Sequence, residues 1–397
     1  MSRTVDTPPS IGLTAPRRRR ARWVPPMMAA AVILLLGGLW EGLVYLGFNL
    51  PAGQAELHQG HGPLMVLGFL GTLISLERAV ALGHAWAYVA PAASAVGGLA
   101  VVVDAPSDLG PSLVLLGGVA LVAIFVAVHR IQASLHNVVL ASGAICWVVA
   151  ATLWLVGWDI PRFIPWLAGF LVLTITGERL ELSRLTGATR LSRVLFGAAA
   201  GVFAIGLIVS LFAGTDGVRI AGVGLCGLAL WLGRYDIARR TVRAKGVTRY
   251  MAVALLTGYV WMAVGGVLWV VIGSMHFTDL GTAAHGSAYD AMLHAIFLGF
   301  VISMIFAHAP VIVPAVLGKP LPYSRVLYVP LALLHLSLLL RLVGGDAFGN
   351  LVSWQWGGVL NETALLLFVG VAATAVIRAS RHRGAARPPL PNRSTTQ

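Results

Sequence analysis

Charged side chains are scarce in this sequence. Lys, Arg, Asp and Glu together make up 11% of its 397 residues, whereas 58% of the residues are apolar and the mean hydropathy is +0.84. A water-soluble domain cannot accommodate so apolar a chain, so the composition excludes a soluble globular protein and predicts a polytopic membrane protein. Acidic residues are fewer than basic residues, with 15 Asp and Glu against 28 Lys and Arg, which leaves a net charge of +13.

Cysteine and several familiar catalytic motifs are also scarce. Cys146 and Cys226 are the two cysteines, and each lies inside a long apolar stretch. This gives little support to a disulfide framework or a cysteine-based metal site and fits two small buried side chains. The sequence has no Gly-rich phosphate loop, no Ser-His-Asp set and no HExxH zinc motif, so enzyme classes that depend on them are not predicted.

Long apolar runs dominate what is present. A helix needs about 20 predominantly apolar residues to cross a hydrocarbon core of about 30 Å. We therefore expect an all-α fold with twelve transmembrane helices. The expected spans are 24–48, 62–83, 85–104, 109–129, 135–157, 163–182, 191–213, 218–238, 250–273, 286–312, 325–343 and 354–377.

The basic residues alternate with these spans. Lys and Arg are retained on the cytoplasmic side of short loops. With the N-terminus inside, 25 of the 28 Lys and Arg are cytoplasmic, and the exceptions are Arg162, Arg219 and Arg341. We therefore expect a bacterial cytoplasmic membrane protein with both termini in the cytoplasm, and one transmembrane domain at 23–378 between the disordered tails 1–22 and 379–397. The basic clusters then orient the chain and contact lipid, and do not bind nucleic acid.

A sequence motif recurs within the chain. A Gly-Phe pair is followed nine residues later by Glu-Arg at Gly68 to Arg78 and again at Gly169 to Arg179, and a weaker copy runs from Gly299 to His308-Ala309. The copies fall on the second helix of each of three four-helix groups, so we expect repeats at about 24–130, 131–249 and 250–378. The Glu-Arg pairs at the cytoplasmic helix ends are interpreted as structural ion pairs, with a proton-pathway carboxylate as the alternative.

Histidines concentrate at the outer surface. A histidine in hydrocarbon is costly and usually has a partner. His61 and His294 lie toward the outer side of equivalent spans, and two facing imidazoles could hold a haem iron. Asp290, at i−4 from His294, could accept its second ring N–H, and Arg341 could contact the haem propionates. The alternative is that these histidines are interfacial polar residues or interhelix hydrogen-bonding partners.

The pattern resembles two known families. Twelve helices in three groups of four, with histidines on the second and tenth, resemble haem-copper oxidase subunit I. The phrases His61-Gly-Pro-Leu-Met-Val-Leu-Gly-Phe-Leu-Gly and His294-Ala-Ile-Phe-Leu-Gly-Phe, the latter continuing to His308-Ala-Pro, more closely resemble the NnrS family. That family comprises polytopic bacterial membrane proteins associated with haem, copper and nitric-oxide resistance. The resemblance implies haem ligation by His61 or His58 and by His294.

A metal site of the oxidase type is not expected. No histidine lies between His136 and His276, where such oxidases have a three-histidine copper site. His308 is fourteen residues from His294, about 21 Å along a helix, so these two cannot share one metal. Any copper would use outer-surface histidines such as His276. The candidate metal ligands are His58, His61, His285, His294 and His308.

Three functions follow as hypotheses. The first is a membrane haem protein that binds, senses or removes nitric oxide or passes electrons from a donor, and the sequence does not decide whether it is an enzyme. The second is a secondary transporter, for which Glu41, Asn361 and Glu362 are candidate intramembrane polar residues, although each could equally be a buried hydrogen-bonded residue. The third is a scaffold or assembly factor.

Overall fold

The computed structural model describes residues 22–50, 60–183, 189–274 and 288–385, and these residues are helical with helix-connecting loops and no strand. Twelve helices of this described part are long and apolar enough to cross a membrane, by length and composition. The predicted all-α polytopic fold with twelve spans is therefore confirmed.

Nine spans contain a single long helix or a helix preceded by a short 3₁₀ turn, and three contain π-helical turns. The elements of the twelve spans are α1 Val24–Tyr45; α2 His61–Pro63, η2 Leu64–Leu70 and α3 Gly71–Leu82; η3 Ala85–Tyr88 and α4 Val89–Val102; α5 Leu109–Ile131; α6 Leu135–Leu155; α7 Ile160–Ser183; α8 Arg190–Val209; α9 Gly214–Tyr235; α11 Gly246–Ile272; α12 Ala288–His294, η6 Ala295–Ile302 and α13 Ser303–Leu317; η7 Arg325–Leu327, α14 Tyr328–Leu339 and η8 Leu340–Ala347; and α15 Leu351–Ala385.

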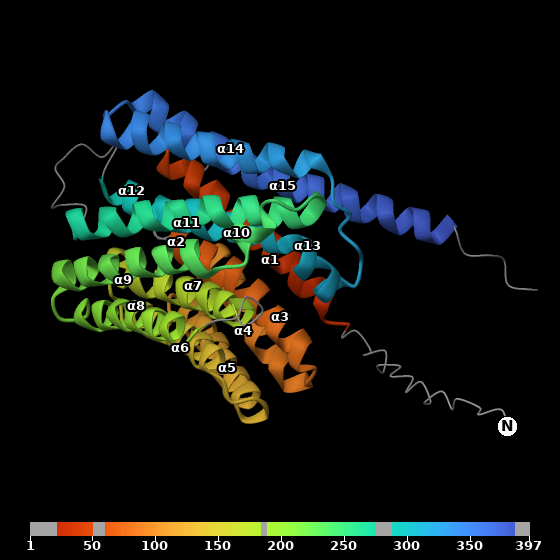
Figure 1. Cartoon of the computed structure of the whole chain (residues 1–397), viewed down its shortest axis with the longest axis horizontal. Helices are drawn as coiled ribbons and strands as arrows, with labels where there is room; N and C mark the ends of the chain where they lie inside the picture. Colours follow the sequence, from red (N-terminus) through yellow and green to blue (C-terminus); the bar gives the residue numbers. More distant parts are fainter. Residues whose placement is uncertain (1–21, 51–59, 184–188, 275–287, 386–397) are drawn as a thin grey trace, which may run out of the picture.

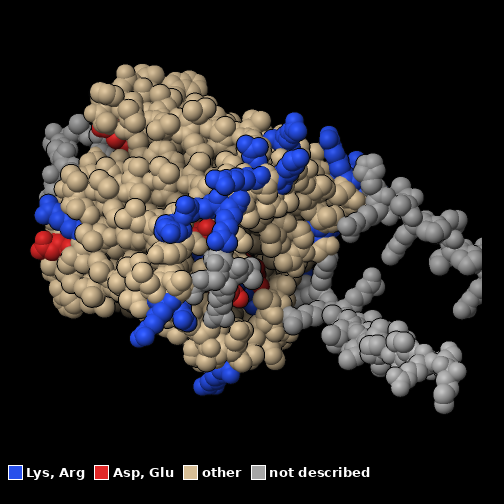
Figure 2. Space-filling model, in the orientation of Figure 1, with Lys and Arg blue, Asp and Glu red and all other residues tan. Residues whose placement is uncertain are grey.

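The helices lie side by side along the long axis of the molecule, with α14 and α15 on one flank and α4, α5 and α6 on the other (Figure 1). Both ends of the described chain lie at one end of the bundle, which we call the terminal end; we call the other the opposite end. Many of the Lys and Arg side chains visible in Figure 2 lie toward the terminal end. The orientation of the bundle relative to the two sides of the membrane stays a prediction.

The helix that carries the second copy of the motif lies at the centre of the bundle. In its most apolar stretch, 83% of the residues of α7 are buried, the largest share of any span described. α7 contacts η2 and η6, and α3 contacts α13. The second, sixth and tenth spans, which carry the three motif copies, therefore meet in the core, whereas the division of the chain into three repeats stays a prediction.

Small residues allow the helices to approach closely. A Cβ added to Gly206 of α8 would lie 2.2 Å from the backbone nitrogen of Ala221 in α9, so only glycine fits this crossing. Lipid supplies no hydrophobic drive for helix association, and membrane helices rely instead on such close contacts and on hydrogen bonds. Core hydroxyl groups bond both within and between helices: Thr72 donates to the Gly68 carbonyl of its own span at 2.6 Å, and Ser94 of α4 donates to the Leu67 carbonyl of η2 at 2.6 Å.

Two of the π-helical segments occupy similar places in two helices. η2 begins three residues after His61 and contains Gly68-Phe69, and η6 begins directly after His294 and contains Gly299-Phe300. The corresponding Gly169-Phe170 in α7 is regular α-helix. Wide turns of this kind are rare and are found frequently at functional sites. They set the second and tenth spans, which carry the two candidate histidines, apart from the sixth.

Candidate functional site

His61 is anchored to the first helix by its ring. It begins α2 at the opposite end of the bundle, and its Nδ1 lies 2.7 Å from the carbonyl oxygen of Gly38 in α1. A carbonyl oxygen only accepts, so Nδ1 carries the proton and Nε2 of the neutral ring keeps its lone pair. Tyr45 packs edge-on against the ring, with 6.2 Å between the ring centroids. His61 therefore presents Nε2 as its available nitrogen.

His294 adopts the same tautomer. Its Nδ1 lies 2.9 Å from the carbonyl oxygen of Asp290, one turn earlier in α12, and 3.0 Å from the Asp290 carboxylate. Among the described residues, the hydrogen bonds of both rings are made by Nδ1, and Nε2 of neither His61 nor His294 has a hydrogen-bond partner. The charges of His294, Arg341 and Asp290 all act on His61, so these groups lie in one region of the bundle. The expected contact of Asp290 with His294 is present, and its role in holding a haem stays a prediction.

Arg341 closes the site from the eleventh span. Its guanidinium binds the Asp290 carboxylate through two nitrogens, Nε at 2.8 Å and Nη2 at 2.7 Å. Such a bidentate pair fixes both side chains in geometry and charge. Backbone and Cβ atoms of Arg341 lie against Gly357 of α15, where an added Cβ would approach to 2.6 Å. Arg341 is thus committed to Asp290, and Nη1 remains for any further anion, including the propionate that we predict.

Glu362 also belongs to this site, although from the sequence it was only a candidate residue of a secondary transporter. A Cβ added to Gly42 of α1 would lie 2.7 Å from the Glu362 Oε1 atom and 3.4 Å from Cε1 of His61. Because Gly42 has no side chain, the Glu362 carboxylate of α15 can lie beside the His61 ring. Glu362 also interacts electrostatically with Arg341. We call His61, Asp290, His294, Arg341 and Glu362 the histidine site.

Asp346 adds another acid to the edge of the histidine site. It lies in η8, five residues after Arg341, and interacts electrostatically with both Arg341 and Asp290. Its two carboxylate oxygens are buried and make no hydrogen bond of ordinary geometry with the described residues. The Asp290 carboxylate thus binds the Arg341 guanidinium directly, and the charges of Asp346 and Glu362 also act on it.

The other predicted ligands are not in the histidine site. His58, His276 and His285 lie outside the described residues, so their predicted metal or haem contacts are not placed. His308 lies in α13 toward the terminal end, where Nδ1 is 2.6 Å from the Met304 carbonyl and Nε2 is 3.2 Å from Arg179. Both ring nitrogens of His308 have protein partners, and a metal ion would have to displace Arg179.

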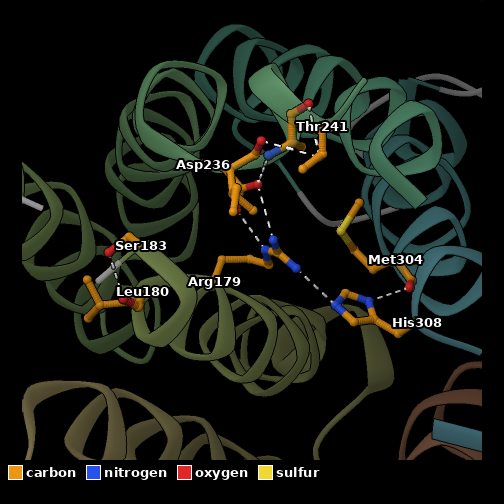
Figure 3. A network of polar contacts seen from close by, with 9 residues as sticks. Arg179, Leu180, Ser183, Asp236, Thr241, Met304 and His308 are labelled. Atoms are coloured by element: carbon orange, nitrogen blue, oxygen red, sulfur yellow. Dashed lines mark hydrogen bonds and ion pairs between the residues drawn. The ribbon is translucent and has the colours of Figure 1, made fainter. Parts of the chain in front are cut away.

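A second polar cluster forms around Arg179 (Figure 3). Arg179 of α7 binds Asp236, at the end of α9, through Nε at 2.7 Å and Nη2 at 3.1 Å, and its Nη1 points to Nε2 of His308 at 3.2 Å. The Tyr259 hydroxyl of α11 interacts electrostatically with both Arg179 and Asp236. We call Arg179, Asp236 and His308 the arginine hub. Its ion pair is almost entirely buried, with 3% of the Arg179 side chain and 1% of the Asp236 side chain exposed.

The three motif copies are linked at the terminal end of the bundle. Arg78 of the first copy forms an ion pair with Glu178 of the second and lies 3.5 Å from Glu77. Arg179 of the second copy contacts His308 of the third. The Glu-Arg pairs therefore form contacts between helices, as the structural interpretation requires, and the proton-pathway alternative stays a hypothesis.

The chain matches, over residues 22–377, the family described as Domain of unknown function (DUF8744). This protein belongs to the DUF8744 family. The match begins just before the first span and ends inside the twelfth, so it covers almost all of the helical bundle. No curated protein matches the chain. The resemblance to the NnrS family stays a prediction.

In this DUF8744 chain, the chemistry-bearing residues separate into two groups. The histidine site lies at the opposite end and holds two imidazoles with unbonded Nε2 atoms beside a carboxylate-rich group. The arginine hub lies toward the terminal end and has its hydrogen-bonding groups paired with one another. A paired network stabilises helix contacts, whereas unbonded ligand atoms are available to a cofactor or substrate. The histidine site is therefore the candidate functional site.

Proposed function

We propose that this chain is a membrane haem protein that holds its haem between His61 and His294 and uses it to bind nitric oxide or to pass electrons. One observation carries the proposal: two half-buried imidazoles in one site each have Nδ1 anchored on a carbonyl oxygen and Nε2 unbonded among the described residues. Axial histidines need this arrangement, because the second ring nitrogen fixes the tautomer and orientation of the ring. The residues present therefore fit a haem.

The surrounding side chains support both imidazoles. The Asp290 carboxylate lies 3.0 Å from Nδ1 of His294 and makes this ring a stronger electron donor. Arg341 holds Asp290 in place and offers Nη1 to a propionate carboxylate. Tyr45 limits rotation of the His61 ring. When bound, a haem iron supplies an atom that binds nitric oxide and exchanges single electrons.

The number of histidines that hold the iron distinguishes the two activities. If His61 and His294 both held the iron, the haem would be suited to passing electrons from a donor protein. If only one of them held it, the haem would be able to bind nitric oxide. The visible spectra of haems held by two histidines and by one differ, so one experiment separates them.

The membrane orientation is part of the proposal. Many of the visible Lys and Arg side chains lie toward the terminal end (Figure 2), and retained basic residues mark the cytoplasmic side. We place the terminal end in the cytoplasm of a bacterial cell and the histidine site toward the outer surface of its cytoplasmic membrane.

Visible spectroscopy of the purified chain tests the proposed function. The protein is expressed with haem supplied, purified in detergent, and measured oxidised, reduced and after addition of nitric oxide. We expect a haem spectrum in the native chain, its loss or a change of ligation in His61→Ala and His294→Ala, and an unchanged spectrum in His84→Ala, a matched control with an exposed histidine. Equal spectra in all four proteins would place the haem elsewhere and reject the site.

A second candidate function, secondary transport, is favoured by the acids of the histidine site. Asp346 lies at the end of the eleventh span and Glu362 lies within the twelfth, and the charges of both act on Arg341. Intramembrane carboxylates often bind protons or cations that drive transport. Under this proposal the native chain is haem-free, and Glu362→Gln abolishes substrate-dependent proton uptake into proteoliposomes. A haem-containing chain whose spectrum depends on His61 and His294 would favour the first proposal.

A further inference from the structure

A cavity separate from the histidine site lies at the opposite end of the bundle. It has a volume of about 370 Å³ and is formed by the start of α7 and the connection between α8 and α9. This size lies within the range of small-molecule sites, about 300–1,000 Å³. None of its lining residues belongs to the histidine site. They include Asp159, Arg162, Pro165, Ser210, Phe212 and Val218.

The cavity contains one cation and one anion that do not neutralise each other. Arg162 and Asp159 both line it, yet among the described residues they form no ion pair within 4.0 Å. Their backbones are joined by a turn, in which the amide of Arg162 donates to the carbonyl of Asp159 at 3.0 Å. The Arg162 guanidinium lies over the Trp158 ring, 4.0 Å from its centroid, which fixes its position without satisfying its N–H donors. The two charges are therefore free to bind a ligand of matching charge.

The cavity also lies where a lipid headgroup would be. α7 begins at Ile160, α8 ends at Val209 and α9 begins at Gly214, so the cavity is at the ends of three spans. Tryptophans such as Trp158 are typical of the interface between headgroups and hydrocarbon. Phe212, on the rim, is 86% exposed and offers an apolar surface beside the charges. The site thus combines an interfacial position, two opposite charges and an apolar rim.

We propose that this cavity binds a phosphoethanolamine group, with its phosphate on Arg162 and its ammonium on Asp159. Arginine donates to phosphate oxygens in charge-assisted hydrogen bonds, and a carboxylate accepts the N–H bonds of a primary ammonium. A phosphocholine group has no N–H to donate, and an anionic headgroup leaves Asp159 without a partner. The apolar rim at Phe212 accommodates the glycerol and first acyl carbons when the group belongs to a phospholipid.

Native mass spectrometry of the full chain, delipidated in detergent, tests this proposal. The probes are short-chain phosphatidylethanolamine, phosphatidylcholine and phosphatidylglycerol, with glycerophosphoethanolamine as the soluble headgroup. We expect the ethanolamine lipid to bind about tenfold more tightly than the choline lipid, since one charge-assisted hydrogen bond changes affinity by about that factor. Asp159→Asn should remove this preference, and Arg162→Gln should weaken binding of every phosphate-bearing lipid by about tenfold.

Matched variants control for charge alone. Asp108→Asn and Arg219→Gln remove the same charges at the same end of the bundle, outside the residues that line the cavity, and should leave the affinities unchanged. Binding of the lipid but not of glycerophosphoethanolamine assigns the site to membrane lipid, whereas equal binding of both assigns it to a free phosphoethanolamine compound. Equal affinity for the ethanolamine and choline lipids, a preference for phosphatidylglycerol, or a preference that survives in Asp159→Asn would overturn the proposal.

Discussion

The arginine hub allows a quantitative test of what holds the helices together. Asp236→Ala removes the partner of a guanidinium that is almost completely buried, and Nε and Nη2 of Arg179 then lose their acceptors. Removing one member of a buried ion pair destabilises a protein by about 3–5 kcal/mol, because the remaining charge is left without a partner. The neighbouring His308 cannot compensate, since as a neutral ring it accepts a single bond, from Nη1. We therefore expect the variant to lose about 3–5 kcal/mol of unfolding free energy.

Replacing both members of the ion pair tests whether the loss of stability comes from the unpaired charge. When both members of a buried ion pair are replaced by apolar residues of similar volume, stability is often unchanged or higher. Arg179→Met combined with Asp236→Leu should therefore be more stable than Asp236→Ala alone. Equilibrium unfolding in mixed micelles with increasing SDS measures the free energies, and Arg239→Ala, which removes an exposed arginine, serves as the control with a change within about 0.5 kcal/mol. This reasoning would be refuted if Asp236→Ala were as stable as the native chain. It would also be refuted if the double variant had no higher free energy of unfolding than Asp236→Ala.

Three further predictions concern the candidate site and the topology. Asp290→Asn should lower haem affinity by about 10–100-fold, because His294 loses its charged partner; haem retention during dilution measures it, and native retention would contradict it. Gly42→Ala should move the Glu362 carboxylate and shift the haem spectrum, because the new Cβ would lie 2.7 Å from Oε1, whereas Gly201→Ala, with open space around it, should leave the spectrum unchanged. A cysteine introduced at Asp108 should react with an impermeant maleimide added outside intact cells, and one at Arg239 should not, as the proposed orientation requires; the reverse labelling would invert the bundle.

The existence of the spans was predictable from sequence because transmembrane length and apolarity are local properties. The residues at which the spans begin and end were less predictable. The tenth span continues to Leu317, five residues beyond the prediction, with Pro310 and Pro314 inside α13. The second span begins at His61, because Pro63 falls in its first turn, where its missing N–H does not matter. The π-helical turns that follow His61 and His294 had no recognisable signal, since they depend on how neighbouring helices pack.

The candidate site was predictable only where one helix determines it. The spacing of Asp290 and His294 brings them together on α12, and this contact is present. The bidentate pairing of Arg341 with Asp290 joins two spans, and no sequence pattern indicated it. Glu362 was noticed as an intramembrane acid, but its position beside His61 depends on the gap at Gly42 in a third helix. In the same way, the repeated motif drew attention to Arg179, whereas its partner Asp236 lies outside the motif.

The haem content of the purified native chain tests the central proposal most directly. The pyridine haemochrome spectrum quantifies haem, and the protein concentration follows from amino-acid analysis of the same sample, prepared with haem supplied during expression. We predict one haem per chain, because the histidine site holds one pair of imidazoles, His61 and His294, each with Nδ1 on a carbonyl oxygen. A folded, monodisperse chain that contains no haem would contradict the proposal and leave secondary transport as the function that the acids of the site support.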